Sequence, residues 1–415
     1  MNGMNVLHLS TSDIDNGGAR AAYRLHQGLR SLGCTSRLLV RAKFSADANV
    51  LVERSILTKL APAVSEVPLR LYPKHQGMFS PQWFPDVLVA RTAELNPDVI
   101  NLHWVCNGYL RVETLSQFRQ PMVWTLHDMW PFTGGCHYNQ DCERYKTSCG
   151  SCPQLHSSQS WDLSRWTWQR KQTAWKNVNL TIVASSQWMA ECARSSSLFR
   201  DQRVEVIPCC LDTEIYKPVN QQFARNLLNL PQDKQLVLFG AIGGTSDRRK
   251  GFHLLQPALQ QLSKAGRHDS IELVVFGASK PEQPLDLGFK SHYLGYVRDD
   301  VTLALIYSAV DVMVVPSLQE AFGQTASEAL SCGTPVVAFN ATGLKDIVDH
   351  QQNGYLATPF EVDDLAKGIA WVLQDKERQQ KLRFQAREKG RQEFSHKLQA
   401  NRYLSLYEKI LGESK

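Results

Sequence analysis

The segment Val312-Met313-Val314-Val315-Pro316 and, shortly after it, Glu320-Ala321-Phe322-Gly323-Gln324-Thr325-Ala326-Ser327-Glu328 predict a buried strand, a turn and a helix. Pro316 ends the apolar run, and Gly333 with Pro335 ends the helix. If the helix begins near Gly323, its free backbone N–H groups and the positive end of its dipole form a site suited to a diphosphate. A strand followed by a helix is also the repeating unit of a parallel α/β sheet.

Two carboxylates flank the predicted turn. Glu328 is expected about one helical turn inside the helix, roughly 6 to 8 Å along its axis from bound phosphates. A carboxylate at that distance can accept hydrogen bonds from both hydroxyls of a ribose. Glu320 precedes the turn and is expected nearer a sugar. The alternative is that Glu320 is a solvated loop residue and that Glu328 only favours the helix N-terminus.

The stretch from Glu320 to Glu328 resembles the E-x7-E motif of retaining glycosyltransferases of family 4, including the aromatic-Gly pair after the first Glu. The segment from Gly135-Cys136-His137-Tyr138 to Cys152-Pro153 is similar to a subgroup related to colanic-acid-type exopolysaccharide transferases. Further segments resemble those of the family along most of the chain: Val6 to Ser10 with Gly17 to Arg20, Trp124 to Asp128, Phe239-Gly240 through Arg249-Lys250-Gly251, and Leu273 to Gly277.

The resemblance implies the GT-B fold, an α/β architecture of two Rossmann-like doubly wound domains that face an interdomain cleft. It assigns 1–210 to acceptor binding, 211–391 to nucleotide-sugar binding, and 392–415 to a helix that packs back on the first domain. The alternation of short apolar runs with helical stretches independently indicates parallel sheets, with the break at Pro208 to Asp212. Strands are expected at Val6–Ser10, Ser36–Val40, Val99–His103, Val123–His127, Thr181–Ser185, Val204–Ile207, Leu236–Gly240, Glu272–Gly277, His292–Leu294, Val312–Val315 and Val336–Phe339.

Composition and charge describe an ordinary globular chain of 415 residues with a net charge of +6. Residues 1 to 210 hold 22 Lys and Arg against 16 Asp and Glu, so the whole excess lies there. This basic half suits an anionic acceptor, a lipid diphosphate or the inner face of a membrane, or is simply a solubilising surface. No apolar run is long enough for a membrane span. We therefore expect a cytoplasmic protein, with peripheral membrane contact as one option and no nucleic-acid partner.

In the first half, Gly17-Gly18 is predicted to lie in the loop after the first strand, where backbone N–H groups can approach a donor phosphate or sugar. The alternative is a plain flexible turn. His127 ends a strongly apolar strand and is followed by Asp128. A lone histidine there is more often structural. The resemblance instead makes His127 a catalytic residue that contacts the transferred sugar. Asp128 is a weaker candidate, since a carboxylate there could simply orient His127.

In the second half, Arg248-Arg249-Lys250-Gly251 precedes a helix. Cations there would offset the negative charge of a departing nucleoside diphosphate, unless the segment is only a solvated basic turn. The family usually has an Arg several residues ahead of the Lys, where Gly243-Gly244 stand here. The resemblance gives catalytic roles to Glu320, Lys250 and Arg249, and donor binding to Gly17, Gly18, Arg248, Gly277, Phe322, Gly323, Gln324, Thr325 and Glu328.

Two further clusters lie in the first half. Cys136, Cys142, Cys149 and Cys152 share one short polar segment and could hold a structural zinc, with free thiols or a redox pair as alternatives. Trp161, Trp166, Trp168 and Trp175 are interspersed with cations. These tryptophans suit an acceptor or a membrane surface, or are core residues.

The predicted activity is transfer of a sugar from a UDP- or GDP-sugar to a glycan or lipid-linked saccharide, in exopolysaccharide or cell-surface polysaccharide synthesis. By resemblance the transfer retains the anomeric configuration and needs no metal cofactor. Alternatives are a sugar-nucleotide epimerase or a phosphorylase on the same fold, and an inactive glycan-binding subunit of a polysaccharide assembly. A pyridine-nucleotide dehydrogenase is disfavoured because the G-x-G-x-x-G fingerprint is missing.

Overall fold

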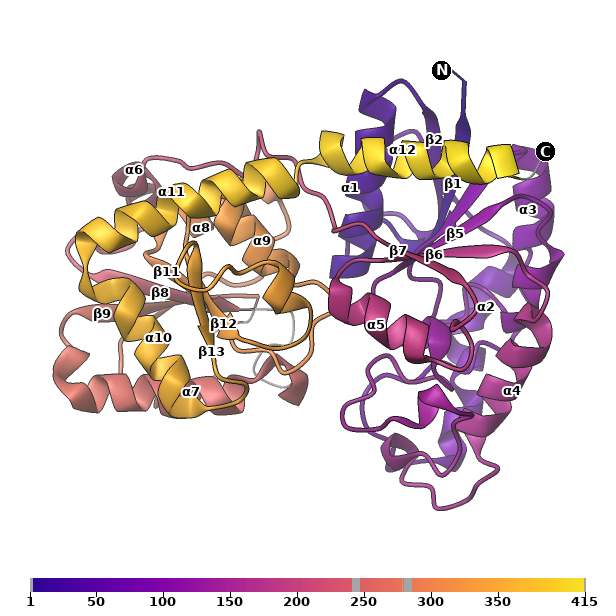
Figure 1. The fold of residues 1–415 in the computed structure, drawn as a ribbon, viewed down its shortest axis with the longest axis horizontal. Helices are drawn as coiled ribbons and strands as arrows, with labels where there is room; N and C mark the ends of the chain where they lie inside the picture. Colours follow the sequence, from indigo (N-terminus) through magenta and orange to yellow (C-terminus); the bar gives the residue numbers. More distant parts are fainter. Residues whose placement is uncertain (1–2, 241–246, 278, 280–285, 414–415) are drawn as a thin grey trace. The chain divides into compact units, whose positions relative to one another are not determined.

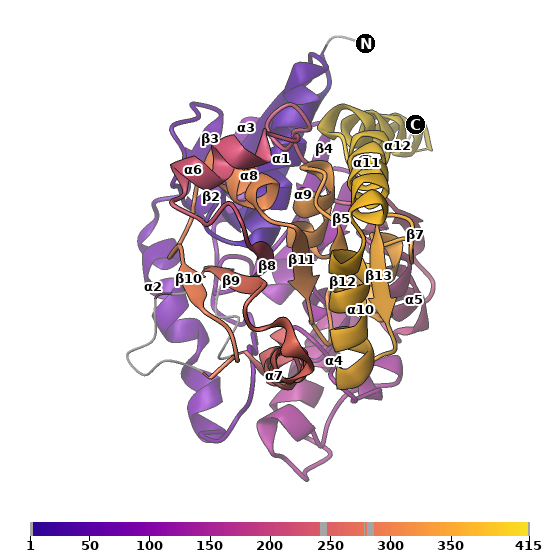
Figure 2. The same cartoon turned by 90° about the vertical axis from the view of Figure 1, so that its left-hand side faces the viewer.

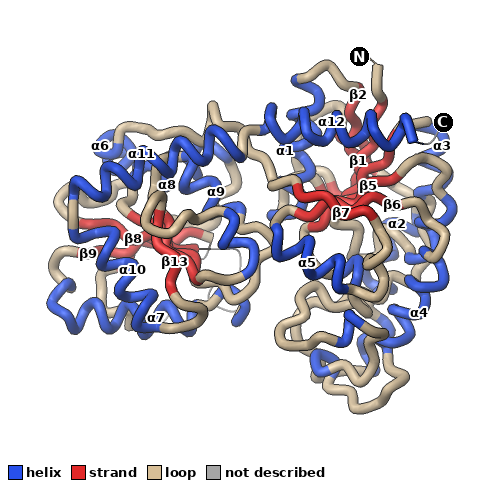
Figure 3. Tube along the Cα trace, in the orientation of Figure 1, coloured by secondary structure: helices blue, strands red, loops and turns tan. Residues whose placement is uncertain are grey.

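The computed structural model describes residues 3–240, 247–277, 279 and 286–413. The chain forms two compact units (Figure 1). Unit 1 comprises Met1–Cys210 together with His396–Lys415, and unit 2 comprises Leu211–Ser395. Figure 3 shows that strands occupy the middle of each unit and that helices lie on both sides of them. Each unit is therefore a three-layer α/β structure.

Unit 1 is built on a seven-stranded sheet in the order β3-β2-β1-β4-β5-β6-β7, and all its strand pairs are parallel. Strands β4, β5 and β6 are buried along their whole length, as expected for a sheet covered on both faces. The strands are β1 (Asn5–Ser12), β2 (Thr35–Ala42), β3 (Val50–Val52), β4 (Val99–Leu102), β5 (Met122–Leu126), β6 (Leu180–Ala184) and β7 (Arg203–Val206).

The core of unit 1 joins segments from both ends of the sequence. Val6 and Val99 of the central strands pack with Leu25 of α1 and with Tyr403 and Tyr407 of α12. The last helix is thus part of the unit 1 core. The helices of the unit are α1 (Gly17–Ser31), α2 (Ile56–Ser65), α3 (Leu88–Leu95), α4 (Leu163–Trp175), α5 (Gln187–Ser195) and α12 (His396–Glu413).

Unit 2 is built on a six-stranded parallel sheet in the order β10-β9-β8-β11-β12-β13, which is seen side-on in Figure 2. The strands are β8 (Gln235–Gly240), β9 (Ile271–Phe276), β10 (Ser291–Tyr293), β11 (Val312–Val315), β12 (Val336–Phe339) and β13 (Gly354–Ala357). The helices are α6 (Gln221–Leu227), α7 (Phe252–Leu262), α8 (Asp300–Ala309), α9 (Gln324–Ser331), α10 (Val362–Gln374) and α11 (Lys376–Glu393).

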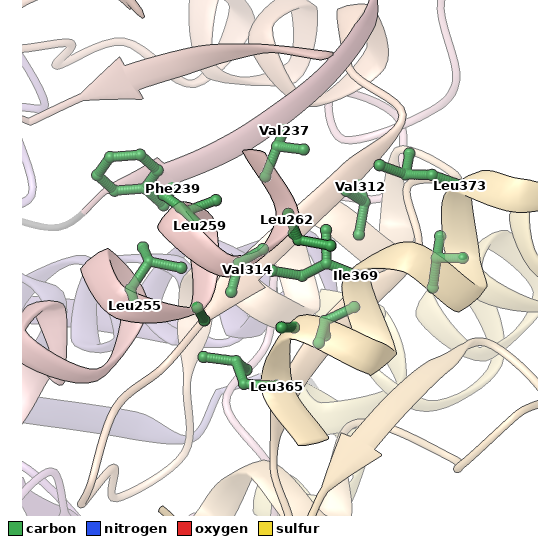
Figure 4. Packing of buried hydrophobic residues seen from close by; sticks show 14 of the residues in the cluster. Val237, Phe239, Leu255, Leu259, Leu262, Val312, Val314, Leu365, Ile369 and Leu373 are labelled. Atoms are coloured by element: carbon green, nitrogen blue, oxygen red, sulfur yellow. The ribbon is translucent and has the colours of Figure 1, made fainter. Parts of the chain in front are cut away.

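One face of the unit 2 sheet carries a large apolar cluster (Figure 4). Val237, Val312 and Val314 of β8 and β11 meet Leu255 of α7 and Ile369 of α10. These residues are fully buried, so the sheet centre is fixed by close packing from two helices. The carboxyl ends of β8 and β11 are held by this rigid layer.

The predicted doubly wound α/β class is confirmed in both units. Every predicted strand is present, and its ends lie within two residues of the predicted ones; β3 and β13 were not predicted. Units 1 and 2 divide at Cys210 and Leu211, inside the predicted break. The last helix begins at His396 rather than at Gln392, because Phe394 is buried in unit 2, where its carbonyl accepts a hydrogen bond from the Leu211 amide (2.9 Å).

The strand orders place a topological switch point in each unit. Connections run to opposite sides of β1 and β4 in unit 1 and of β8 and β11 in unit 2. In open α/β sheets ligands bind beyond the carboxyl ends of the strands at this point. His103 and His127 follow β4 and β5 directly, and Glu320 follows β11. The fold therefore places Glu320 at the switch point of unit 2, whereas His127 of unit 1 follows β5, one strand away from the β1–β4 switch point.

Candidate functional site

An ion pair at the end of β11 is the centre of the candidate site in unit 2. Lys250 donates a hydrogen bond from Nζ to Oε1 of Glu320 (2.6 Å), and Ser317 Oγ donates to the same oxygen (2.9 Å). Arg249 Nη1 lies 3.8 Å from the other carboxylate oxygen of Glu320. The structure thus brings together the three residues of this unit that the resemblance made catalytic.

The charge state of Glu320 follows from these neighbours. Burial acts to raise the pKa of its carboxyl, but Lys250 and Arg249 together with the hydrogen bonds of Lys250 and Ser317 outweigh it. The net result is a pKa below the usual glutamate value. Glu320 is therefore an anion held between two cations, and α9 begins four residues after it.

Two close backbone approaches fix this arrangement. Gly251 has a φ of +73°, and a Cβ there would overlap the carbonyl oxygen of Pro316, so the segment carrying Lys250 packs directly on the end of β11. The Leu318 amide donates to the carbonyl of Arg249 (2.8 Å) in the same contact. On the other side, the amide of Glu320 donates to Thr342 Oγ1 (3.0 Å). The loop bearing Glu320 is thus anchored on both sides.

The helix predicted after Glu320 is α9, and Gly323 is its N-cap residue with a φ of +108°. Gln324 and Thr325, in its first turn, are half-buried. Phe322 is buried and packs edge-to-face on Phe394 with 5.6 Å between ring centroids, so its side chain has a packing role. Gly333, with a φ of +74°, lies just beyond the end of α9, as predicted.

Glu328 is buried on α9 and accepts a hydrogen bond from the Tyr307 hydroxyl of α8 (2.8 Å). Tyr307 is itself fully buried, so its hydrogen bond restrains the orientation of the Glu328 carboxylate. Sequence reasoning missed Tyr307, and no local motif marks it. A buried glutamate held by a tyrosine is a preorganised acceptor for hydroxyl groups.

Arg249, Arg248 and Gly277, the other predicted residues of unit 2, differ in their hydrogen bonds and exposure. Arg249 also donates from Nη1 to the carbonyl of Gln319 (2.9 Å) and from Nη2 to Asp247 (2.9 Å), whereas Arg248 is exposed. Gly277, with a φ of +77°, follows β9. Gly243-Gly244, where the family usually has its arginine, lie outside the described residues.

In unit 1 the structure places Gly18 against His127. A Cβ on Gly18 would lie 3.3 Å from His127 Cβ and 3.5 Å from Trp104 Cβ. Gly17 and Gly18 were predicted in a loop, but they form the first turn of α1. The reason is Asn16, whose side chain accepts a hydrogen bond from the Ala19 amide (3.0 Å) and caps the helix.

A chain of three histidines runs from His127 into the sheet. His127 Nε2 lies 3.0 Å from His103 Nδ1, and His103 Nε2 lies 2.9 Å from His8 Nδ1. His8 and His103 are buried, and His127 is half-buried. Sequence reasoning missed His8 and His103. A signal was present, because each histidine follows a leucine in a central strand or at its end: Leu7-His8, Leu102-His103 and Leu126-His127.

The three histidines are neutral near pH 7. Burial lowers the pKa of His127 to about 4, although Asp128 acts in the opposite direction. Burial and the neighbouring rings of His8 and His127 hold the pKa of His103 well below the usual value. Burial and His26 do the same for the pKa of His8. Each ring then carries a single N–H proton.

Asp128 was expected to orient His127, but its hydrogen bonds go elsewhere. Its Oδ2 accepts from His137 Nδ1 (2.6 Å) and from Trp104 Nε1 (2.8 Å). Burial acts to raise the pKa of Asp128, but these partners, His137 first, bring it below the usual range. Asp128 therefore holds the loop around His127, and the contact to the His127 ring is made by His103.

The four predicted metal ligands lie together in unit 1. Cys136, Cys142, Cys149 and Cys152 all line one cavity of about 20 Å³, which is room for roughly one water-sized particle. All four are free thiols. Over the described ranges, however, no set of three or more His, Cys, Asp or Glu side chains is arranged to hold a metal ion. The zinc site stays a prediction.

The tryptophans of the predicted acceptor or membrane stretch mostly belong to the core. Trp168 and Trp175 are buried, and Trp166 packs beside a small apolar cluster. Trp161 is 64% exposed. The core interpretation therefore holds for Trp168 and Trp175, and Trp161 is the one member of the four that faces outward.

Comparison with known families agrees with this geometry. Residues 15–215 match the family model described as Glycosyltransferase Family 4, and residues 220–389 match the model described as Glycosyl transferases group 1. A D-inositol 3-phosphate glycosyltransferase of Xylanimonas cellulosilytica is 34% identical over 206 residues, which cover 46% of this chain and 47% of that protein. The chain spans about half the length of the curated relatives it matches.

Solved structures share the fold over the whole chain. Sucrose-phosphate synthase from Thermosynechococcus elongatus has a TM-score of 0.69 at 21% identity and covers 100% of both chains. HepE from Anabaena, solved in complex with UDP-glucose, has a TM-score of 0.65 at 20% identity over 97% of this chain and 99% of its own. With the two family models placed end to end along it, the chain belongs to the glycosyltransferases of the GT-B fold.

Proposed function

We propose that this chain transfers a sugar from a UDP- or GDP-sugar to a glycan or lipid-linked saccharide, with retention of the anomeric configuration. The observation that carries the proposal is the cluster of Lys250, Arg249 and Glu320 just ahead of the N-terminus of α9. Two cations and a helix N-terminus are what a leaving nucleoside diphosphate requires. Exopolysaccharide or other cell-surface polysaccharide synthesis is the setting that the cysteine-rich segment suggests by resemblance.

Each group has a defined task in the proposed reaction. Lys250 and Arg249 offset the negative charge that develops on the diphosphate as its bond to the anomeric carbon breaks. Glu328, held by Tyr307, accepts hydrogen bonds from the ribose hydroxyls. The acceptor hydroxyl attacks from the face of the leaving group and passes its proton to the departing phosphate. His127 contacts the transferred sugar.

The comparisons support the donor class and point to a second acceptor class. HepE was solved with UDP-glucose, which supports a UDP-sugar for this chain. The curated relatives include several D-inositol 3-phosphate glycosyltransferases, which makes a phosphorylated polyol the second acceptor to test. The excess of basic residues in 1–210 is compatible with either anionic acceptor.

A donor screen by thermal shift tests the proposal first, because a ligand that binds only the folded protein raises its melting temperature. We expect UDP, GDP or one of their sugars to stabilise the wild type and to stabilise Lys250→Ala less. The stabilising sugar is then incubated with labelled acceptors, and the anomeric configuration of the product is read by NMR. Conversion of the donor without any acceptor would indicate an epimerase. Absence of binding by every nucleotide would overturn the proposal.

A further inference from the structure

Helix α2 (labelled in Figure 2) exposes its large apolar residues and buries its small and polar ones, which is the reverse of an ordinary surface helix. Its buried residues are Thr58, Ala61 and Ser65, which are small or polar. Its large apolar residues face outward: Ile56 is 75% exposed and Leu60 is 51% exposed. A surface helix normally buries its apolar stripe against the core. The apolar stripe of α2 therefore has no partner within the described part of the chain.

The orientation of α2 is fixed by close packing. A Cβ on Gly108 would lie 2.6 Å from both the carbonyl carbon and the oxygen of Ala61, so the two backbones touch. Ala61 is fully buried in this contact. At the start of the helix, Ser55 Oγ accepts a hydrogen bond from the Thr58 amide (3.2 Å). Rotation of α2 to bury its leucines would force Ala61 off Gly108, so the exposed face is built into the fold.

Exposed apolar residues also occur in the segments that follow the helix. The next segment, Val67–Leu71, forms a short 3-10 helix that buries Leu69 but leaves Leu71 80% exposed. Fifteen large hydrophobic side chains are exposed in the described residues, and six of them lie within 56–78. Single exposed hydrophobic residues scattered over a surface are normal, but a group of this kind is not. We call these six the α2 face: Ile56, Leu57, Leu60, Val67, Leu71 and Met78.

An exposed tryptophan lies in the segment that contacts Tyr72, the residue after Leu71 of the α2 face. Trp161 lies two residues before Leu163, whose amide donates to the Tyr72 hydroxyl (3.1 Å). Tyr72 directly follows Leu71 of the α2 face. Tryptophan is enriched where proteins meet the headgroup region of a bilayer, because its ring is apolar and its N–H is polar.

The exposed charges of residues 54–78, which carry the α2 face, are nearly all positive. Four cations are exposed within 54–78, and Glu66 is the one exposed acid there. An apolar stripe rimmed by cations matches an anionic bilayer surface, where acyl chains take the apolar residues and headgroups attract the cations. A protein partner would need an acidic rim of its own. The four cations are Arg54, Lys59, Arg70 and Lys74.

We propose that the α2 face docks unit 1 on the surface of an anionic lipid bilayer. The helix lies in the interface without crossing it: no helix within the described ranges is both long and apolar enough to traverse a bilayer. The inference needs nothing of the proposed transferase reaction. It does explain how such an enzyme would reach a lipid-linked acceptor.

Co-sedimentation of the full chain with vesicles tests the proposal. We expect the wild type to bind vesicles that contain phosphatidylglycerol, to bind pure phosphatidylcholine weakly, and to be released by salt. The triple variant Ile56→Ser, Leu60→Ser, Leu71→Ser should reduce partitioning by about tenfold or more. A second triple variant, Lys59→Gln, Arg70→Gln, Lys74→Gln, should abolish the preference for anionic lipid. Vesicles should also blue-shift the wild-type tryptophan emission, and Trp161→Phe should reduce that shift.

The matched control is Phe223→Ser with Leu227→Ser, because both side chains are 54% exposed on α6 of unit 2. This variant should bind vesicles like the wild type, and circular dichroism should show that all variants are folded. Equal vesicle binding by the wild type and the apolar triple variant would overturn the proposal. The proposal would also be overturned if the wild type did not bind vesicles but formed a dimer that the apolar triple variant cannot form. The α2 face would then serve self-association.

Discussion

His103 Nδ1 lies 3.0 Å from His127 Nε2, so the imidazole at the end of β5 is held by the imidazole at the end of β4. At the other end of this row of three histidines, His8 Nε2 is buried and has no hydrogen-bond partner within the described residues. An orphaned N–H is rarer in proteins than an orphaned acceptor. We therefore assign the His8 proton to Nδ1, which donates to His103. His103 then donates from Nδ1 to His127, and the His127 proton is on Nδ1.

The first prediction tests this tautomer order through His103. His103→Leu removes the donor to His127 and should lower kcat by about tenfold, the factor that corresponds to ~1.4 kcal/mol. His103→Asn keeps an N–H near the position of Nδ1 and should restore most of the loss. KM for the donor should change little, because Lys250, Arg249 and Glu328 are untouched. Steady-state kinetics of both variants give the comparison.

The control for His103 is His292→Leu, because His292 is half-buried and bonds to Glu272 Oε2 (2.5 Å) in unit 2, outside the histidine chain. Its effect should be confined to stability. Nitrogen chemical shifts of labelled histidine report the tautomers directly and do not require turnover. A proton on Nε2 of His127 would contradict the assignment even if the enzyme is active.

The second prediction concerns the ion pair of Lys250. Lys250→Met removes a cation from the leaving group and should lower kcat by about 10²-fold, as loss of one preorganised charge donor does in other enzymes. The matched control is Lys290→Met, which breaks the ion pair of Lys290 with Glu272 (3.4 Å) elsewhere in unit 2. Wild-type turnover in Lys250→Met, or an equal loss in Lys290→Met, would remove Lys250 from the reaction.

The third prediction separates Glu328 from the tyrosine behind it. Glu328→Ala should weaken UDP binding by about 10- to 100-fold, because hydrogen bonds to a charged group contribute about 1.5–3 kcal/mol. Tyr307→Phe leaves the carboxylate in place but unrestrained, so its effect should be smaller and of the same sign. Isothermal titration of UDP measures both, and Tyr355→Phe, which loses a similar bond to Asp364 (2.9 Å), is the control. A larger loss in Tyr307→Phe than in Glu328→Ala would exclude the ribose role.

The fourth prediction concerns the cysteine cavity, for which we propose one structural zinc per chain. The four thiols line a space for about one ion, and four thiolates are the ligand set of many structural zinc sites. Elemental analysis should find about one zinc in the wild type and none in Cys149→Ser with Cys152→Ser. The control is Cys332→Ser. Cys332 is a buried cysteine of unit 2, so this variant should keep the metal. If the wild-type protein contains no metal and the four thiols of this segment all react, the cysteines are packing residues and not zinc ligands.

The fifth prediction uses a buried lysine in unit 1. Lys171 is fully buried, its Nζ donates to the carbonyls of Trp130 and of Thr133 (3.0 Å), and burial lowers its pKa to about 7. Between this pKa and the ordinary lysine value of 10.5, the unfolded chain keeps a proton that the folded chain has lost. The free energy of unfolding should therefore rise with pH in this window, by up to about 1.4 kcal/mol per pH unit.

Urea unfolding at several pH values between neutral and alkaline checks the Lys171 prediction. Tryptophan fluorescence reports unit 1, because every tryptophan except Trp371 lies there. Lys171→Met has no such proton to release and should lack the rise, while other titrations are shared by both proteins. Parallel curves for the two proteins would mean that Lys171 keeps its proton in the folded state.

The sequence was informative wherever local chemistry decides the structure. Val312 to Val315 is apolar and β-branched and could only be a buried strand, and Gly323 with Gly333 marked both ends of α9. β3 and β13, edge strands of three and four residues that pair with β2 and β12, were missed, although the equally short edge strands β7 and β10 were predicted. Asn16 shows the converse, since one capping side chain turned a predicted glycine loop into helix.

The parts of the candidate site that the sequence did not predict are contacts between distant segments. His8 and His103 are 95 residues apart, and Tyr307 and Glu328 belong to different helices. No spacing rule links such pairs, because the sheet order decides which strand ends become neighbours. The outward face of α2 was hidden for a similar reason. Its pattern is that of any amphipathic helix, and only the contact of Ala61 with Gly108 shows which side is buried.

The position of α12 has a consequence for biosynthesis. This helix supplies Tyr403, Leu406 and Tyr407 to the unit 1 core, and Asn101 of β4 donates a hydrogen bond to the Tyr407 hydroxyl (2.7 Å). On the ribosome, all of unit 2 is made before these residues emerge. Unit 1 therefore cannot complete its core, in which α12 packs on α1, until α12 has been synthesised. The nascent chain would thus depend on chaperone protection longest at the domain that is synthesised first.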